Sequence, residues 1–210
     1  MLAVDAIQDL AREMSVRSSI ESLGRLFSIV LALAIGEAFK QFVSDKAEKP
    51  EDRHIHWDRL CALVAFIILV VPFSHGMARY FHETYKEGAR PNPYALYLSI
   101  DSVAFTVEAI FFFVLSRSLP RVQWRRFHLT VVCLLLVDIL WGAFAAFSHA
   151  PRMWPWVFVN IIAVILLGIV LWAFSEKNSW HGLSFALLVV IARTAADYYT
   201  SQEFYFPPLP

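Results

Sequence analysis

Two carboxylates, Asp101 and Glu108, lie inside one long apolar run, Tyr94 to Leu115. They are seven residues apart, so on an α-helix they share nearly the same face, about 20° out of register and about 10 Å apart along the axis. A helix of this length reaches roughly 33 Å, which is enough to cross the hydrocarbon core of a bilayer. Because an ionised carboxylate in contact with lipid is costly, we expect this face to turn toward other helices or water.

Other apolar runs carry polar side chains at successive depths in the predicted membrane. Arg193 and Asp197 are four residues apart and are expected to form a structural ion pair on one helix. Carboxylates inside a membrane can pass protons or replace part of the hydration shell of a cation. The sequence therefore predicts a pathway for protons or small cations, in an ion channel or proton-coupled transporter, lined by Asp101, Glu108, Asp138, Glu37, Asn160 and His75.

Two alternative functions stay open at this point. Protonated carboxyl groups can also join helices by hydrogen bonds, which would fit a non-catalytic membrane subunit or effector that organises partners. His75 and His149 both fall near the membrane face that carries the termini, and two such histidines could ligate a haem or another metal in an oxidoreductase subunit. His54, His56, His128 and His181 near the other face are weaker metal candidates. No cofactor is expected, although haem is left open.

The sequence motifs that mark common enzyme sites are missing from this sequence. There is no His-Glu-x-x-His, no Gly-x-Ser-x-Gly and no phosphate-binding glycine loop. We assign no catalytic residue and do not expect an enzyme. The formal net charge is zero, so there is no basic field that would favour nucleic acid as a partner.

The elements that must position these residues are predicted to be membrane helices. The composition is 58% hydrophobic and 17% charged, which is more apolar and less charged than in an average soluble domain. We predict an all-α, polytopic integral membrane protein with an amphipathic N-terminal helix over 1–22, a six-helix bundle over 23–200 and a short tail over 201–210. The six transmembrane helices are expected at about 23–42, 60–80, 94–115, 127–147, 153–174 and 180–199.

Several local features refine this prediction. Pro72 cannot donate to the carbonyl of Ile68, so a kink is expected there. Tryptophans at the edges of the spans are interpreted as an interfacial belt: Trp57, Trp124, Trp154, Trp156 and Trp180. Lys and Arg are slightly more numerous in the loops opposite the termini, which places both termini on the non-cytoplasmic side.

The expected partners are the lipid bilayer, a second copy of the chain in a homo-oligomer, and a protein partner. The pair Phe27-Ser28 resembles the start of the Phe-Ser-Asp motif of small six-helix bacterial potassium channels. Here Ile29 follows the serine in place of the aspartate, so the sequence assigns the chain to no family.

Overall fold

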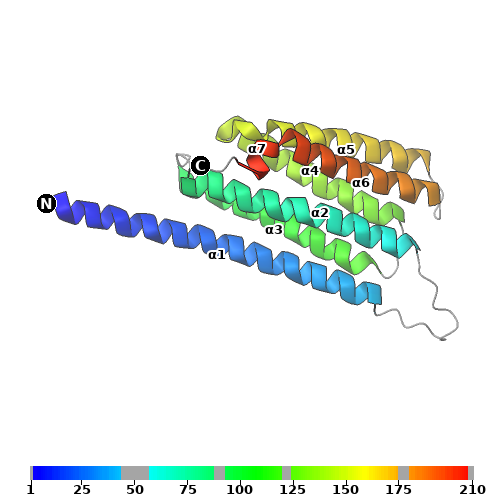
Figure 1. Cartoon of the computed structure of the whole chain (residues 1–210), viewed down its shortest axis with the longest axis horizontal. Helices are drawn as coiled ribbons and strands as arrows, with labels where there is room; N and C mark the ends of the chain where they lie inside the picture. The colour runs from blue at the N-terminus through cyan, green and yellow to red at the C-terminus, as the bar shows by residue number, and fades with distance from the viewer. Residues whose placement is uncertain (1, 44–56, 88–92, 120–123, 175–179, 208–210) are drawn as a thin grey trace.

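The computed structural model describes residues 2–43, 57–87, 93–119, 124–174 and 180–207, and within these ranges the regular structure is helical throughout (Figure 1). A π-helical segment, η2 (His82–Glu87), follows the second long helix, and a 3-10 turn, η4 (Pro151–Met153), precedes the fifth. The α-helices are α1 (Leu2–Val43), α2 (Trp57–Phe81), α3 (Tyr94–Ser118), α4 (Trp124–Ser148), α5 (Trp154–Ala173), α6 (Trp180–Thr200) and α7 (Gln202–Tyr205).

Six of these helices, α1 to α6, are long and apolar enough to cross a bilayer. This confirms the prediction of an all-α chain with six transmembrane helices, and the chain is a multi-pass integral membrane protein. The apolar side chains exposed on the outer faces of the bundle, such as Leu140 and Ile165, then contact lipid, where their exposure costs nothing.

The N-terminal region differs from the prediction. Residues 1–22 were expected to form a separate amphipathic helix, but α1 runs without a break from Leu2 to Val43 and is itself the first of the six spans. No proline interrupts it, and the hydroxyls of Ser19, Ser22 and Ser28 donate to carbonyls four residues earlier in the same helix. These serines therefore continue the helix instead of capping a new one. The amphipathic face proposed for residues 1–10 concerns side chains outside the described part of the structure.

The long helices pack as a closed ring in the order α1, α3, α4, α5, α6, α2. Consecutive helices along the chain alternate in direction, so that α7 and the start of α1 lie at the same end of the bundle (Figure 1). We call this the terminal end. α2 contacts α1, α3, α4 and α6, which makes it the helix nearest the centre.

Pro72 lies inside α2, where the helix continues on both sides of it. The carbonyl of Ile68 loses its usual donor at this proline. The hydroxyl of Thr194 on α6 donates to that carbonyl at 3.3 Å. A neighbouring helix thus satisfies the backbone group that the proline leaves free, as membrane helices require.

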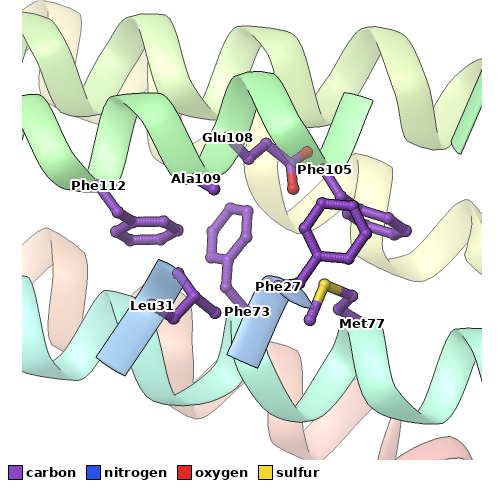
Figure 2. Close-up of a pocket in the computed structure, with 8 residues that line it drawn as sticks. All are labelled: Phe27, Leu31, Phe73, Met77, Phe105, Glu108, Ala109 and Phe112. Carbon is purple, nitrogen blue, oxygen red and sulfur yellow. The ribbon is translucent and has the colours of Figure 1, made fainter. Parts of the chain in front are cut away.

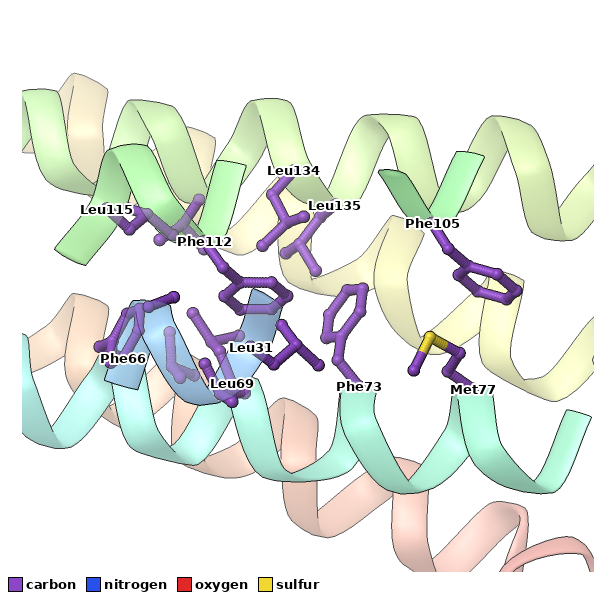
Figure 3. Close-up of a cluster of buried hydrophobic side chains, with 14 of the residues drawn as sticks. Leu31, Phe66, Leu69, Phe73, Met77, Phe105, Phe112, Leu115, Leu134 and Leu135 are labelled. Carbon is purple, nitrogen blue, oxygen red and sulfur yellow. The ribbon is translucent and has the colours of Figure 1, made fainter. Parts of the chain in front are cut away.

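The interior divides into an apolar half and a polar half. In the half away from the terminal end, leucine and phenylalanine side chains of α2, α3 and α4 fill the space between the helices (Figure 3). The labelled members include Phe66, Leu69, Phe112, Leu115 and Leu134, all buried. Ser116 and His128, the buried polar side chains described in this half, each bond to a carbonyl of their own helix.

Candidate functional site

The buried polar side chains outside that apolar half gather between the middle of the bundle and the terminal end. Each is exposed by 3% or less, although it carries an ionisable or amide group: Asp101, Glu108, Asp138, Asn160, Arg193 and Asp197. They come from α3, α4, α5 and α6, so the ring of helices brings together residues that are almost a hundred positions apart in the chain. The structure divides them into two networks.

The first network surrounds Asp101 on α3. Its Oδ2 accepts hydrogen bonds from the hydroxyls of Tyr80 at 2.9 Å and Tyr85 at 2.5 Å, and its Oδ1 accepts one from Trp141 Nε1 at 2.9 Å. Tyr80 and Tyr85 are five residues apart and Tyr85 lies in η2, where the i to i+5 repeat of a π-helix brings both phenols to the same carboxylate. The carboxylate of Asp101 is therefore fully supplied with donors and joins α2, η2, α3 and α4.

This network reaches the surface through His149, which lies just beyond α4. The hydroxyl of Tyr80 is 2.7 Å from His149 Nε2. Burial lowers the pKa of His149, and the nearby carboxylate of Asp101 opposes this shift. Tyr97 stacks on the same imidazole ring at a centroid distance of 4.5 Å.

The second network starts from Glu108 and Asp138, whose carboxyl groups lie within hydrogen-bonding reach of each other across α3 and α4. Asp138 Oδ2 accepts from Trp156 Nε1 and Asn160 Nδ2. Asp138 Oδ1 and Glu108 Oε1 are buried and have no donor among the described residues. Two carboxyl groups can bond to each other only if at least one of them carries a proton, and a shared proton would satisfy both.

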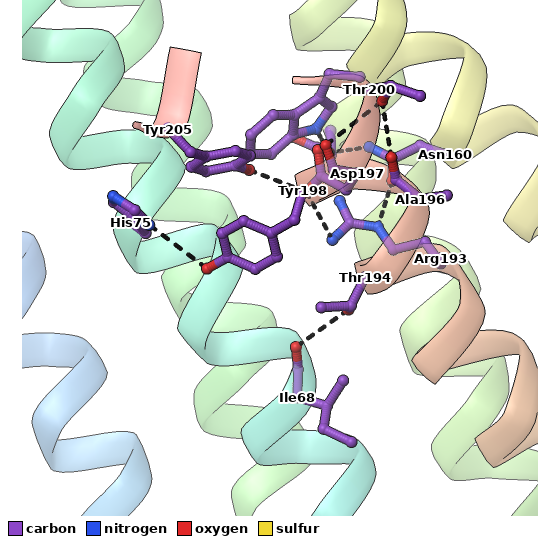
Figure 4. A network of polar contacts seen from close by, with 12 residues as sticks. Ile68, His75, Asn160, Arg193, Thr194, Ala196, Asp197, Tyr198, Thr200 and Tyr205 are labelled. Atoms are coloured by element: carbon purple, nitrogen blue, oxygen red, sulfur yellow. Dashed lines mark hydrogen bonds and ion pairs between the residues drawn. The ribbon is translucent and has the colours of Figure 1, made fainter. Parts of the chain in front are cut away.

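Asn160 connects this carboxyl pair to Arg193 (Figure 4). The amide donates to Asp138 through Nδ2 and accepts from Arg193 Nε through Oδ1 at 2.8 Å. Arg193 Nη1 lies 3.4 Å from Asp197 Oδ2, an ion pair with both side chains buried. Asp197 Oδ2 also accepts from the hydroxyl of Tyr205 on α7 at 2.9 Å, so the network ends at the short helix that covers the terminal end.

Aromatic rings enclose the guanidinium of Arg193. Its Cζ lies 5.4 Å from the ring centre of Phe73 and 5.6 Å from that of Trp156, where the negative faces of the rings stabilise a buried cation. Gly76 on α2 is needed for this packing, because a Cβ at that position would overlap the indole ring of Trp156. The network thus contains three carboxyl groups, those of Glu108, Asp138 and Asp197, and one permanent cation.

Two residues predicted for the pathway lie apart from the carboxyl pair of Glu108 and Asp138. Glu37 is on α1, where its carboxylate accepts from Gln41 Nε2 at 2.5 Å and pairs with Lys40 Nζ at 3.6 Å. His75 borders the end of the second network: it packs against the rings of Tyr205 and Phe206, and its Nδ1 lies 3.5 Å from the hydroxyl of Tyr198 (Figure 4). The structure does not bring either side chain into contact with the carboxyl pair.

The proposed haem and metal ligands do not gather in the described part of the structure. His75 and His149 belong to different aromatic clusters, and no group of three or more His, Cys, Asp or Glu side chains that could hold a metal occurs among the described residues. His54 and His56 lie outside the described residues. An absorbance spectrum of the purified protein remains the test of the haem alternative.

Two of the tryptophans interpreted as interfacial, Trp124 and Trp156, are each only 4% exposed, so their rings pack inside the bundle near the ends of α4 and α5 and do not face lipid. Trp156 is buried because its Nε1–H has a carboxylate acceptor on α4 and because Gly76 leaves room for its ring.

The sequence analysis also missed Tyr80, Tyr85 and Tyr205, the phenols that donate to Asp101 and Asp197. The spacing of Trp156 and Asn160, four residues apart on one helix face, is the signal that could have paired Trp156 with the site.

The fold and the site define a class: a six-span helical membrane protein with a buried network of carboxyl groups and one guanidinium. Comparison with protein-family models, with curated proteins and with solved structures finds no match to this chain. Its function is therefore argued from the site alone.

Proposed function

We propose that this chain is a proton-coupled membrane transport protein and that the carboxyl pair of Glu108 and Asp138 is its proton-binding site. The observation that carries the proposal is the contact between these two carboxyl groups in the dry interior, with one oxygen of each lacking a donor among the described residues. A pair of this kind binds a proton that can leave only if another positive charge replaces it or the site meets water.

The division of the interior into a polar and an apolar half supports coupled transport in preference to conduction through an open pore. Polar groups extend from the carboxyl pair through Asn160, Arg193 and Asp197 toward the terminal end. On the other side of the pair the interior is filled by apolar side chains such as Phe66 and Phe112. A proton passing from the pair to that side requires the helices to rearrange, which is the property of a transporter that opens alternately to its two sides.

Asp101 has a different role in this proposal from the one the sequence indicated. Its two oxygens already accept three hydrogen bonds from α2, η2 and α4. A carboxyl group with these donors on three neighbouring elements serves to hold the helices together. We assign proton binding to Glu108 and Asp138 and assign helix organisation to Asp101.

The experiment is proton flux in sealed liposomes that contain the purified chain and a pH-sensitive dye. Gradients of H⁺, K⁺, Na⁺ and a small organic ammonium ion are imposed in turn. The wild-type chain is expected to move protons under at least one of these gradients, and Asp138→Asn and Glu108→Gln are expected to reduce the rate to that of empty liposomes. Glu37→Gln is the matched control and keeps the wild-type rate, because Glu37 has no contact with the pair.

Wild-type flux in both Asp138→Asn and Glu108→Gln would overturn this proton site. Liposomes that stay tight with the wild-type chain under every gradient would favour the alternative of a non-catalytic membrane subunit or effector, in which the polar networks only hold helices together.

For the orientation in the membrane we propose that both termini lie on the non-cytoplasmic side. The support is the excess of Lys and Arg in the loops at the opposite end, which tend to stay in the cytoplasm. A homo-oligomer is the further assembly that we propose, and its test is the mass of the chain in a mild detergent.

A further inference from the structure

The side chains that lead from the carboxyl pair toward the terminal end cannot pass a proton along by themselves. Asn160 and Arg193 connect Asp138 to Asp197 (Figure 4). An amide does not titrate, and a guanidinium keeps its protons throughout the pH range in which proteins fold. A proton that moves between the pair and the terminal end therefore needs water inside the second network.

The side of the pair that faces α1 and α2 offers almost no room for water. The pair adjoins a cavity of about 10 Å³ there (Figure 2), which is about the space that one water molecule needs. Seven of the eight side chains around this cavity are apolar, and the eighth is that of Glu108. The terminal end is therefore the side from which water can enter.

An open cavity of about 550 Å³ lies at the terminal end, between η4 with the start of α5 and the junction of α6 with α7. Its lining includes the exposed charged side chains of Arg152 and Glu203, so it is a place for water. Thr200 and Ser201 also line it, and both donate to the carbonyl of Asp197, at 3.4 Å from Thr200 Oγ1 and 2.9 Å from Ser201 N. This cavity is thus one helical turn away from Asp197.

Tyr205 on α7 closes the second network at this end. Its hydroxyl donates to Asp197 Oδ2 at 2.9 Å, and its ring centre lies 6.1 Å from that of Trp156 and 4.9 Å from that of His75. Figure 4 shows the phenol lying across the end of the network. With Tyr205 in this position, Asp197 and Arg193 are both buried.

The attachment of α7 to the bundle is slight. The helix is a single turn, Gln202–Tyr205, and Ser201 alone joins it to α6. Apart from the bond of Tyr205, a hydrogen bond from Arg79 Nε on α2 to the carbonyl of Phe204 holds it at 2.9 Å. Arg79 is partly exposed, so water can compete for this bond. Displacing α7 therefore requires few contacts to break.

Polar atoms beneath α7 would gain partners if it moved. Asp197 Oδ1 and Arg193 Nη2 are buried and have no hydrogen-bond partner among the described residues. Neither atom takes part in the proton shared by Glu108 and Asp138. Because buried polar atoms without partners are costly, water that enters at this place would be stabilised by both of them.

We propose that α7 is the gate through which water and protons reach the carboxyl pair from the terminal end, and that Tyr205 is the residue that closes it. The six spans keep the arrangement described here while α7 opens. Water from the terminal cavity then reaches Asp197 and Arg193, and through them the pair. This inference rests on the proposed function and adds the control of access to the same site.

The first test measures water at Trp156 by hydroxyl-radical labelling and mass spectrometry of the full-length chain in mild detergent. Tyr205→Phe keeps the ring and loses the hydrogen bond to Asp197, so the open state and the labelling of Trp156 should increase about 2- to 10-fold. Tyr199→Phe is the matched control and should label as the wild type does, because Tyr199 is 82% exposed. Equal labelling of Trp156 in wild type and Tyr205→Phe would overturn the role of Tyr205.

The second test ties α7 to α2 and then releases it. The rings of His75 and Phe206 have centres 5.5 Å apart. In a chain with Cys61→Ala and Cys133→Ala, the pair His75→Cys and Phe206→Cys can therefore be joined by a short bifunctional methanethiosulfonate, whose disulfides a reductant cleaves. The linked chain should show at least tenfold lower proton flux in liposomes and lower labelling of Trp156, and reduction should restore both.

Two controls make the link specific. His75→Cys alone and Phe206→Cys alone, treated with the same reagent, should not change in flux on reduction. Trp124 is as little exposed as Trp156, at 4%, but lies at the other end of the bundle. Its labelling should not respond to the link.

The outcomes separate this inference from the proposed function. Proton flux that is unchanged by a complete link would overturn the gate and leave proton-coupled transport standing. Labelling of Trp156 that falls with the link, in a chain that moves no protons under any gradient, would overturn transport and leave the gate standing. Labelling of Trp156 that ignores the link would overturn the gate whether or not the chain moves protons.

Discussion

At the scale of single residues, the two oxygens of Asp138 have different surroundings. Oδ2 accepts hydrogen bonds from Trp156 and Asn160, whereas Oδ1 is buried with no donor among the described residues. The first oxygen holds α4 against α5, and the second is free to share a proton with Glu108. One side chain thus has a structural role and a proposed chemical role, and substitutions can separate them.

Asp138→Asn is expected to retain the fold and lose proton transport. The amide oxygen of asparagine can still accept from Trp156 and Asn160, and its NH₂ can donate to Glu108 in place of the shared proton. We expect a melting temperature in detergent within a few degrees of wild type, together with flux at the level of empty liposomes. Asp138→Leu leaves both donors without an acceptor and should destabilise the fold by about 2–4 kcal/mol. An Asp138→Asn chain that unfolds like Asp138→Leu would contradict this separation.

His149 should make the stability of the protein depend on pH. Burial lowers the pKa of His149 in the folded chain, so between that pKa and the ordinary value for histidine, about 6.5, the unfolded chain binds a proton that the folded chain does not. Stability therefore falls as the pH falls through this window. We expect the loss of melting temperature between about pH 7 and pH 5 to be smaller in His149→Gln than in wild type.

His181→Gln is the control for this measurement, since His181 is exposed and has no hydrogen bond to either polar network. An equal loss of melting temperature in wild type and His149→Gln would contradict the role of His149. The comparison uses the difference between variants because other groups also titrate over this range.

At the scale of elements, α2 depends on its neighbours for its shape and its place in the centre. Pro72 removes one backbone donor inside the helix, and α6 replaces it through Thr194. Gly76, one turn later, allows the indole ring of Trp156 on α5 to approach. A proline and a glycine that would weaken an isolated helix therefore position α2 against the two helices that carry Asn160 and Arg193.

Thr194→Val should destabilise the bundle by about 0.6 kcal/mol and at most about 1.7 kcal/mol, the mean and the maximum measured for hydrogen bonds between membrane helices. The substitution preserves shape and leaves the carbonyl of Ile68 without the donor from α6. Unfolding in a mixed detergent with increasing denaturing fraction measures the change. Thr106→Val is a matched control near zero, because Thr106 is exposed and donates to the carbonyl of Ser102 in its own helix. Equal effects of the two substitutions would contradict the assigned role.

At the scale of the whole molecule, the bundle has a polar half toward the terminal end and an apolar half away from it. Because the two halves differ, the orientation of the bundle decides which side of the membrane the polar half faces. If both termini are non-cytoplasmic, the polar half faces outward and the carboxyl pair exchanges protons with that side in the conformation described here.

Labelling of single cysteines should reveal this orientation. With Cys61 and Cys133 replaced by alanine, Glu203→Cys on α7 is expected to react with an impermeant maleimide added outside intact cells. Arg126→Cys, at the start of α4 on the opposite end, should react only after permeabilisation. Both side chains are exposed, so accessibility does not limit either reaction. The reverse pattern would overturn the orientation, and labelling of both in intact cells would contradict a bundle that separates the two ends.

The sequence by itself determined that the chain has six membrane helices and roughly where each lies. Hydropathy and helix length are local properties, and the cost of exposed backbone in lipid leaves few other solutions. It also placed Arg193 and Asp197 on one helix face, since that spacing is local too. The break predicted after residue 22 was wrong, because polar serines do not end a helix whose backbone continues unbroken.

Only the tertiary structure decided which polar groups meet. The sequence predicted that Asp101, Glu108 and Asp138 lie at successive depths. The lateral order and rotation of the helices bring the carboxyl group of Glu108 to that of Asp138. They place Asp101 instead against three donors, those of Tyr80, Tyr85 and Trp141. Depth follows from position along one helix, whereas a contact between helices depends on how all the side chains around the ring pack together. The depth of a residue can therefore be read from its own stretch of sequence. Its partner on another helix can be read only from the folded bundle.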